Sequence, residues 1–523
     1  MVIMSKIPDI PEDQRTETVV ALIEVITMQQ EVIQQLRDEI ARLKGQKPKP
    51  DIKPSRLEQR LQNKQVDDKS GKRPGSIKKS KTKQLQIHDT REIRPEGIPL
   101  GSRFKGYQDY VVQDISIKLH NTKYRLECWQ APQGTYVVGK LPEDVNGHFG
   151  PMLVSYILYQ YYHAHVTQPL ILEQLLEFGV DISAGQINRI ITEEKERFHA
   201  EKEDILKAGL EISGHINVDD TGARHEGRNG YCTHIGNELF AWFQSTENKS
   251  RINFLQLLRT GHNDYIVNSD AVNYMEAQGL SVTQITKFKA FCDASFESLQ
   301  KWEENLQALN ITDDRHIRIA TEGALLGSVL EHGFNRELII VSDDAGQFNV
   351  FMHALCWIHA ERTINKLVGF NDKQTEALEE IRSRIWELYD ELKDYKKLPG
   401  KEKKIQIEKR FDEIFTSKTC FVTLNNVLKR LHKNKRELLM VLEHPDIPLH
   451  NNLSENDIRE YVKKRKISGS TRSDSGRRCR DTFTSLKKTC RKLGVSFWEY
   501  LKDRVTGRNA IARLPDLIRL RAL

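Results

Sequence analysis

The chain has 523 residues, of which 29% are charged, and a formal net charge of +7. This length exceeds what one compact core holds, so roughly two to four domains are expected. Seven scattered cysteines, without a Cys-x-x-Cys pair, argue against a disulfide scaffold and against a cysteine-rich zinc ribbon. No apolar signal core follows the N-terminus and no run of about 18 apolar residues occurs, so we expect a cytoplasmic protein without a membrane span.

Residues 12–44 carry apolar side chains that alternate three and four positions apart. This is the spacing of an a/d seam, and it predicts a coiled coil that joins the chain into a homodimer or a higher homo-oligomer. The alternative is that the stripe packs against the body of the same chain. The seam consists of Val19, Leu22, Ile26, the polar Gln29, Ile33, Leu36, Ile40 and Leu43.

Residues 45–94 are rich in lysine and proline, which predicts a disordered basic linker. From Lys44 to Lys83, fourteen Lys or Arg stand against four Asp or Glu, and a second basic stretch runs from Lys463 to Lys492. Such blocks favour a polyanionic partner, because neutralising phosphates releases counterions. For any one block, a solvated tail or helix face is the alternative.

Two smaller regions follow the linker. Residues 95–140 alternate in a strand-like way and predict a small β-element. Residues 141–205 are predicted to be helical, with one helix from Gln168 to Phe178, a turn at Gly179 and a second helix capped by Ser183. This layout is typical of a helix-turn-helix, although an ordinary helical hairpin has the same pattern.

Residues 206–505 predict a mixed α+β or α/β domain. Three antiparallel strands, a helix, a further strand and a late acidic helix follow one another, which is the order of a ribonuclease-H-like fold. Helical insertions near 251–335 and 374–443 interrupt this order, and residues 506–523 are left as a C-terminal tail. The expected elements are strands at 212–221, 230–235, 238–246 and 265–268, and helices at 250–258, 286–335 and 354–368.

Three carboxylates stand in distinctive local contexts. Asp219 and Asp343 each end an apolar, strand-like run, and Glu455 lies where a loop turns into a helix. Two strand-end aspartates and one helix-borne glutamate suit two Mg²⁺ ions, which take oxygen ligands and act together in phosphoryl displacement. For any single acid, the alternative is an ordinary turn residue.

Five segments of the chain carry distinctive motifs: Leu141-Pro142 with Gly147–Pro151, Val218–Thr221, Cys356–Arg362, Pro448–Arg459 with Arg465-Lys466, and Leu493–Leu501. These segments resemble the insertion-sequence-66 family of DDE transposases. The stretch Cys-Trp-x-His-x-x-Arg and the block around Glu455 are the most specific of them, and the N-terminal heptad and basic linker match the usual layout of the family.

The resemblance implies a DNA transposase that cleaves and joins strands at element ends. Asp219, Asp343 and Glu455 would be the catalytic residues and would bind two Mg²⁺ ions, with Mn²⁺ able to substitute. The implied partners are element ends, target DNA and accessory proteins of the same element. The candidate DNA-binding residues are Lys78, Lys79, Arg459, Lys463, Arg465 and Lys466.

Some assignments stay open at this stage. Asp270 is a rival for the second acid, because the segment between the first two acids is long. Asp220 and Asp344 adjoin the preferred residues, and the sequence does not separate each pair.

Other features also allow more than one reading. Cys356 and His359 could contribute to a metal site, but a core cysteine and a hydrogen-bonded histidine are the preferred interpretation. Only Cys128 remains of the family's cysteine-rich element, which argues against zinc there. A non-catalytic DNA-binding regulator and a metal-dependent nuclease are the alternative functions.

Overall fold

A computed structural model describes most of the chain from residue 86 onward. The basic linker up to residue 85, with Lys78 and Lys79, lies outside the described residues, as does most of the predicted coiled coil. The chain divides into two compact units, residues 1–24 with 121–523 and residues 25–120. The described residues are 16, 18, 19, 22, 25, 26, 28, 29, 86–115, 117–142, 147–291 and 293–522.

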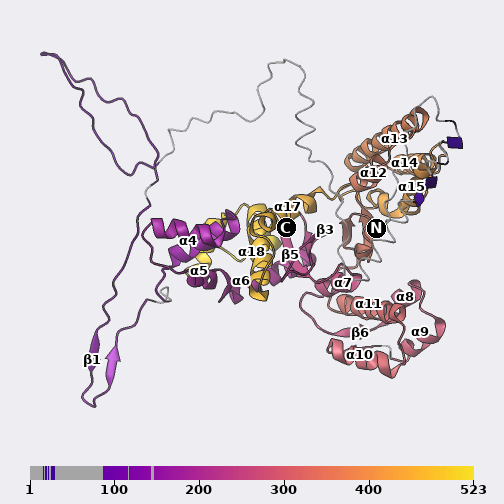
Figure 1. Cartoon of the computed structure of the whole chain (residues 1–523), viewed down its shortest axis with the longest axis horizontal. Helices are drawn as coiled ribbons and strands as arrows, with labels where there is room; N and C mark the ends of the chain where they lie inside the picture. Colours follow the sequence, from indigo (N-terminus) through magenta and orange to yellow (C-terminus); the bar gives the residue numbers. More distant parts are fainter. Residues whose placement is uncertain are drawn as a thin grey trace, which may run out of the picture. The chain divides into compact units, whose positions relative to one another are not determined.

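The larger unit is built on a five-stranded mixed sheet with the strand order β5-β4-β3-β8-β9 (Figure 1). Within this sheet, β3, β4 and β5 are antiparallel to one another in turn, β8 is parallel to β3, and β9 is parallel to β8. The β-branched run Ile339–Val341 is suited to the buried centre of such a sheet. The strands are β3 (His215–Gly222), β4 (Tyr231–Gly236), β5 (Ala241–Thr246), β8 (Ile339–Ser342) and β9 (Met352–Leu355).

Alternate residues of these strands face two different cores. Ile216, Val218 and Ile340 belong to the largest apolar cluster. Ile339 and Val341 point the other way, toward α12 to α15. On that second face α17 also packs against β3 and β4. The helices of the second face are α12 (Trp357–Asn365), α13 (Asp372–Lys397), α14 (Lys401–Phe415), α15 (Val422–Lys433) and α17 (Asn452–Ser468).

The free edge of β5 is covered by α18 (Asp474–Lys492). Every second N–H group of the strand donates to a side chain of the helix, and those side chains lie four residues apart. The match arises because two strand residues span about 6.7 Å and four helical residues about 6 Å. The pairs are Ala241 N with Thr489 Oγ1 at 3.2 Å, Phe243 N with Ser485 Oγ at 2.9 Å and Ser245 N with Asp481 Oδ2 at 2.7 Å.

We expect Ser485→Ala to destabilise the protein by about 1–3 kcal/mol, because the buried Phe243 N–H loses its acceptor. Urea unfolding followed by circular dichroism measures this difference. Ser475→Ala, at an exposed position of the same helix, is the control and should change little. Equal effects of the two changes would show that α18 does not cap the strand edge in this way.

The insertion between β5 and β8 forms its own layer of helices around two short strands (Figure 1). The strand predicted at 265–268 is present as β6, but it pairs with β7 and not with the main sheet. The predicted helical stretch 286–335 is therefore interrupted by β7, the partner strand of β6. The elements are α7 (Arg251–Leu258), β6 (Tyr265–Val267), α8 (Ser269–Ala277), α9 (Val282–Lys289), β7 (Ala294–Phe296), α10 (Leu299–Ala308) and α11 (Asp314–Glu331).

Two further expectations need correction. The helix predicted at 354–368 begins only at Trp357, because Met352–Leu355 pair with β8 as a strand. The β-element predicted at 95–140 contains only β1 (Cys128–Gln130) and β2 (Tyr136–Val138), a fully exposed hairpin. Residues 110–117 alternate in sequence, but the described residues among them belong to no strand.

The helical region before the sheet has the predicted hairpin. Gly179 adopts a φ of 82° between α4 and α5, and Ser183 caps α5 by accepting a hydrogen bond from Gln186 N at 3.2 Å. The elements of this region are α3 (Pro151–Leu158), the π-helix η2 (Tyr159–His163), α4 (Gln168–Glu177), α5 (Ala184–Thr192) and α6 (Glu196–Ile212).

No helix in the described part of the chain combines the length and apolar character that crossing a membrane needs.

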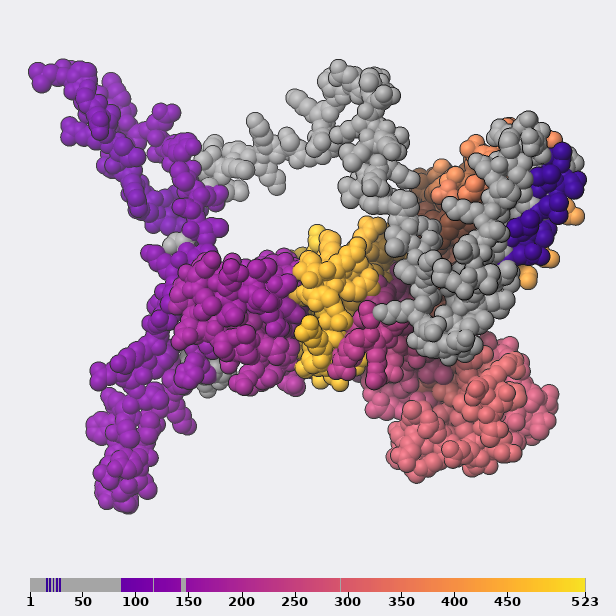
Figure 2. All heavy atoms as spheres, viewed as in Figure 1, coloured from indigo at the N-terminus to yellow at the C-terminus, as the bar shows by residue number. Residues whose placement is uncertain are grey.

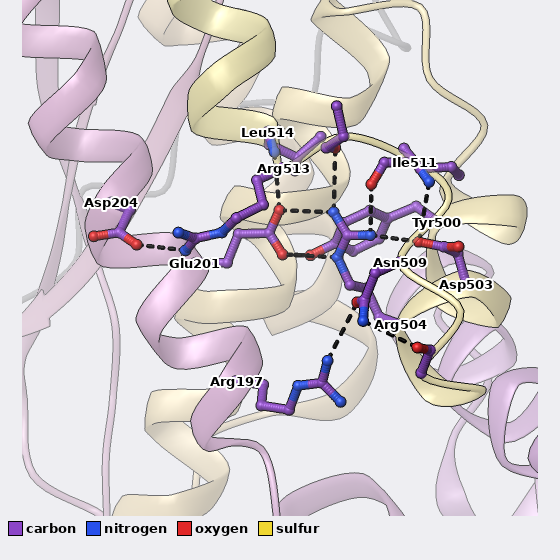
Figure 3. A network of polar contacts seen from close by, with 12 residues as sticks. Arg197, Glu201, Asp204, Tyr500, Asp503, Arg504, Asn509, Ile511, Arg513 and Leu514 are labelled. Carbon is purple, nitrogen blue, oxygen red and sulfur yellow. Dashed lines mark hydrogen bonds and ion pairs between the residues drawn. The ribbon is translucent and has the colours of Figure 1, made fainter. Parts of the chain in front are cut away.

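The C-terminal residues 506–523 were predicted to be a tail, but 506–522 are part of the folded unit. Helix α20 (Leu514–Ala522) follows α19 (Phe497–Val505) and packs on α6. Figure 2 shows yellow C-terminal residues beside the magenta residues that precede the sheet. Buried Glu201 accepts hydrogen bonds from Tyr500, Arg504 and the backbone N of Leu514 (Figure 3). A cavity of about 980 Å³ lies beside this network, and none of the three predicted catalytic acids lines it.

Candidate active site

The two strand-end aspartates lie at one edge of the sheet. Strands β3 and β8 run parallel with Asn217 opposite Val341, so two further residues bring Asp219 beside Asp343. Neighbouring strands are about 4.8 Å apart. Asp219 Oδ1 accepts a hydrogen bond from its neighbour's backbone N at 2.7 Å, and Asp343 Oδ1 accepts one from Ala345 N at 3.1 Å.

A buried asparagine joins the helix of Glu455 to this edge. Asn451, which precedes α17, donates from Nδ2 to Val218 O at 2.7 Å and accepts from Asn217 Nδ2 at 2.9 Å. Its backbone N also donates to Cys356 Sγ at 3.1 Å, at the start of α12. One residue therefore connects β3, α12 and the first turn of α17, where Glu455 lies.

Strand alternation separates Asp219 from Asp220. Asn217 faces α17, and the side chain two residues later points to the same face, which places Asp219 there. Asp220 instead accepts hydrogen bonds from Thr233 Oγ1 at 2.5 Å and from Gln347 Nε2 at 2.9 Å. Of the two neighbours, Asp219 is the one on the side of Glu455.

The other rivals have partners elsewhere. Asp344 is half-exposed and accepts a hydrogen bond from Asn434 Nδ2 at 3.2 Å. Asp270 lies in the first turn of α8 and forms a two-point ion pair with Arg336. The structure thus brings Asp219, Asp343 and Glu455 toward one another, and gives Asp344 and Asp270 other partners.

The electrostatics of the cluster show an excess of negative charge. The pKa of Asp219 is raised to about 7, chiefly by burial and also by the charges of Asp343, Asp220 and Glu455, while a backbone hydrogen bond from Asp220 opposes the rise. Within the described residues, neither Asp219 nor Asp343 forms an ion pair. Partly buried carboxylates without a counter-charge, such as Asp219 and Asp343, are an environment in which a bound cation is stabilising.

We expect this charge excess to make the cation-free protein less stable as the pH rises. The folded-state pKa of about 7 lies above the ordinary 3.8, so the folded protein binds this proton more tightly than the unfolded chain does. The resulting stabilisation is present below about pH 4 and is lost as the pH rises through about 7. With chelator present, the stability of Asp219→Asn relative to the wild type should therefore increase as the pH rises over this range, by on the order of 1–3 kcal/mol. Thermal melts of both proteins at several pH values measure the difference, and a constant difference would contradict it.

Glu455 differs from the two aspartates, because basic side chains surround it. Its Oε1 lies 2.8 Å from Arg362 Nη1 and 3.6 Å from His359 Nε2, and its Oε2 lies 3.8 Å from Arg459 Nη2. Burial lowers the pKa of His359, against the opposing influence of Asp343 and Glu455. His359 thus borders the acids, whereas buried Cys356 serves as an acceptor for the backbone of Asn451.

The predicted DNA-binding side chains on α17 fall into two groups. Arg459, Lys463 and Lys466 are exposed and continue along the helix face that begins at Glu455. Arg465 instead donates to Thr221 Oγ1 and Gly222 O at the end of β3. Arg465 therefore fastens α17 to the sheet, and the other three remain available to an anionic partner.

The donor set fits a hard divalent cation in its chemistry. Three carboxylates supply only oxygen ligands, and the raised pKa of Asp219 reflects the charge that a cation would neutralise. In the described part of the chain, no group of three or more His, Cys, Asp or Glu side chains is already arranged around a common metal position. Glu455 is instead paired with Arg362.

Sequence reasoning missed the side chains that hold α17 in place. His234 on β4 contacts Ser454 Oγ at 3.0 Å and Asp457 Oδ2 at 3.2 Å, and Lys488 and Lys492 each lie 2.8 Å from the same Asp457 carboxylate. Ser454 and Asp457 stand in the block around Glu455, as does Asn451. Their place in that block was the one available signal, and their partners are more than 25 residues away in sequence.

Comparison with known proteins identifies the family of the chain. Residues 322–478, which include Asp343 and Glu455, match the family described as "Transposase IS66 family". The chain is also 43% identical over 321 residues to "Uncharacterized protein y4jO" of Sinorhizobium fredii (strain NBRC 101917 / NGR234). This match covers 61% of the present chain and 100% of that relative. The chain belongs to the IS66 family of transposases.

Proposed function

We propose that this chain is a DNA transposase that cleaves strands at the ends of its insertion sequence and joins them to target DNA. The observation that carries the proposal is the convergence of Asp219, Asp343 and Glu455 at one edge of the sheet. Family membership supports the same class of protein.

The strand order supports a ribonuclease-H-like catalytic domain. Three antiparallel strands come first, and the fourth and fifth are added in parallel beside the first. The first aspartate follows the centre of the first strand, the second follows the fourth strand, and the glutamate lies on a later helix. Ligands in open sheets bind outside the carboxyl ends of the strands, where these acids lie.

The chain's own residues supply placement and charge. Two Mg²⁺ ions bound by the three acids, with Mn²⁺ able to substitute, would activate the attacking oxygen and stabilise the leaving one. Asn451 fixes the helix of Glu455 against β3, so the carboxylates are held on rigid elements. Arg459, Lys463 and Lys466 line the exposed face beyond Glu455, and would hold DNA phosphates.

We also propose the partners that such a reaction requires. Element ends and target DNA are the substrates, and accessory proteins of the same element are further partners. Weak activity of the purified chain alone would indicate that those proteins are required. The N-terminal heptad would join copies of the chain, so that two ends are handled together. The protein would act in the cytoplasm, where the DNA is.

The test is to incubate the purified full-length chain and Mg²⁺ with labelled duplexes that carry the terminal sequences of its own element, together with target DNA. Cut products and joined products are separated on a gel. We expect both. Cut but unjoined strands would instead indicate a nuclease, and binding without cutting would indicate a non-catalytic regulator.

A further inference from the structure

The pairing of Glu455 with Arg362 distinguishes this acid from the other two. Arg362 comes from α12, a different element, and its Nη1 lies 2.8 Å from Glu455 Oε1. Asp219 and Asp343 have no ion pair in the part of the chain that the structure describes. One of the two carboxylate oxygens that Glu455 could offer to a cation is therefore already paired with a guanidinium group.

The backbone that carries Arg362 is firmly placed. Trp357, at the start of α12, donates from N to Leu449 O at 3.0 Å and from Nε1 to Leu438 O at 2.8 Å. The Cys356 thiol accepts a hydrogen bond from the backbone N of Asn451, the residue before α17. The helix of Arg362 and the helix of Glu455 thus share one buried anchor.

The side chain of Arg362 is free to change partners. It is 44% exposed, and ion pairs at exposed positions contribute little to stability. By contrast, Arg459 lies farther from Glu455, at 3.8 Å, and donates to Asn456 Oδ1 on its own helix at 2.9 Å. Of the two arginines, Arg362 is the one engaged directly with the acid cluster.

We propose that Arg362 is a substrate-binding residue that exchanges Glu455 for a DNA phosphate when divalent cations enter the site. This inference rests on the proposed function. A cation and a guanidinium group compete for the same oxygen and repel each other, so cation binding drives Arg362 away from Glu455. The anion then nearest to it is the phosphate backbone of the bound DNA, to which arginine can donate two hydrogen bonds.

The first measurement is cation binding without DNA, by calorimetric titration of the full-length chain with MnCl₂. We expect Arg362→Gln to bind Mn²⁺ about two- to fivefold more tightly than the wild type, because a competing exposed ion pair is removed. Arg336→Gln is the matched control, since it removes an exposed arginine from its pair with Asp270, and should leave Mn²⁺ affinity unchanged. Thermal melts show whether each variant is folded.

The second measurement is cleavage of labelled element ends with Mg²⁺. We expect Arg362→Gln to lower the cleavage efficiency at least about tenfold, the factor of one charge-assisted hydrogen bond to phosphate. Arg362→Lys keeps the charge and should recover part of the loss. Arg336→Gln should cleave as the wild type does.

Tighter Mn²⁺ binding together with weaker cleavage would support the exchange of partners. Unchanged or weaker Mn²⁺ binding by Arg362→Gln, or undiminished cleavage, would overturn it while leaving the proposed function intact. A wild-type chain that neither binds Mn²⁺ nor cleaves the ends would overturn the proposed function and this inference with it.

Discussion

Asp219→Asn should abolish strand cleavage and joining while binding of element ends persists. The change keeps the size and shape of the side chain and removes the negative charge that a divalent cation needs. Phosphoryl transfer depends on that charge for positioning and stabilisation, so we expect the rate to fall at least about a thousandfold. A gel assay of labelled ends with Mg²⁺ measures cleavage, and a mobility-shift assay measures binding.

Asp270→Asn and Asp344→Asn are the matched controls. Asp270, on α8, is paired with Arg336, and Asp344 accepts a hydrogen bond from Asn434, so neither change touches the cluster. Both variants should cleave at close to the wild-type rate. A fully active Asp219→Asn would show that the first acid has been assigned to the wrong residue, and an inactive Asp270→Asn would show the same for the second acid.

The stability of Asp219→Asn separates loss of chemistry from loss of folding. Burial and neighbouring carboxylates raise the pKa of Asp219, so its ionised form is unfavourable in the cation-free protein. The amide removes this penalty, and the variant should therefore melt at or above the wild-type temperature near pH 8. An inactive protein that is at least as stable would place the defect in the reaction itself.

The elements that could be predicted from sequence have local signals. Ser183 and Gly179 mark the ends of the two helices in the hairpin, and the structure has both the cap and the left-handed turn. The first three strands of the main sheet are antiparallel as expected, with Gly227 in the turn after β3 and Gly236 as the last residue of β4. In each case the residues that decide the structure are neighbours in the chain.

The elements that were predicted incorrectly depend on partners that are distant in sequence. Strand 265–267 is apolar like the strands of the main sheet, and only its pairing with Ala294–Phe296 shows that it belongs to the insertion. Residues 352–355 continue into a helix, and their strand character comes from β8 beside them. Helix 514–522 packs on α6 through contacts some 300 residues apart.

The candidate site also combines features that local sequence predicts with features that depend on distant partners. The motifs around Asp219, Asp343 and Glu455 indicate these acids as candidates, but they do not show which of two adjacent aspartates faces α17. That choice follows from the contact of Asn217 with Asn451, more than 230 residues away. The pairing of Arg362 with Glu455 is also long-range, although Arg362 stands in a recognised motif.

Asn451→Ala should combine the largest loss of stability with a loss of activity. The change removes the buried side chain that donates to Val218 O and accepts from Asn217 Nδ2, and it leaves both partners unpaired. Each unpaired group costs about 1–3 kcal/mol, so we expect a loss of about 3 kcal/mol in urea unfolding. Glu455, one turn later, would lose its fixed position, and a displacement of about 1 Å can lower the rate about a hundredfold.

Asn456→Ala is the matched control, because Asn456 is exposed on the same helix and contacts only Arg459 among the hydrogen bonds that the structure describes for it. We expect near wild-type stability and cleavage from this variant. Refolded Asn451→Ala, measured at a temperature where it is fully native, tests whether activity depends on placement beyond stability. If it then cleaves normally, α17 finds its position without Asn451, and the buried link between β3, α12 and α17 serves folding alone. If cleavage stays low, the same link also sets the distance between Glu455 and the two strand-end aspartates.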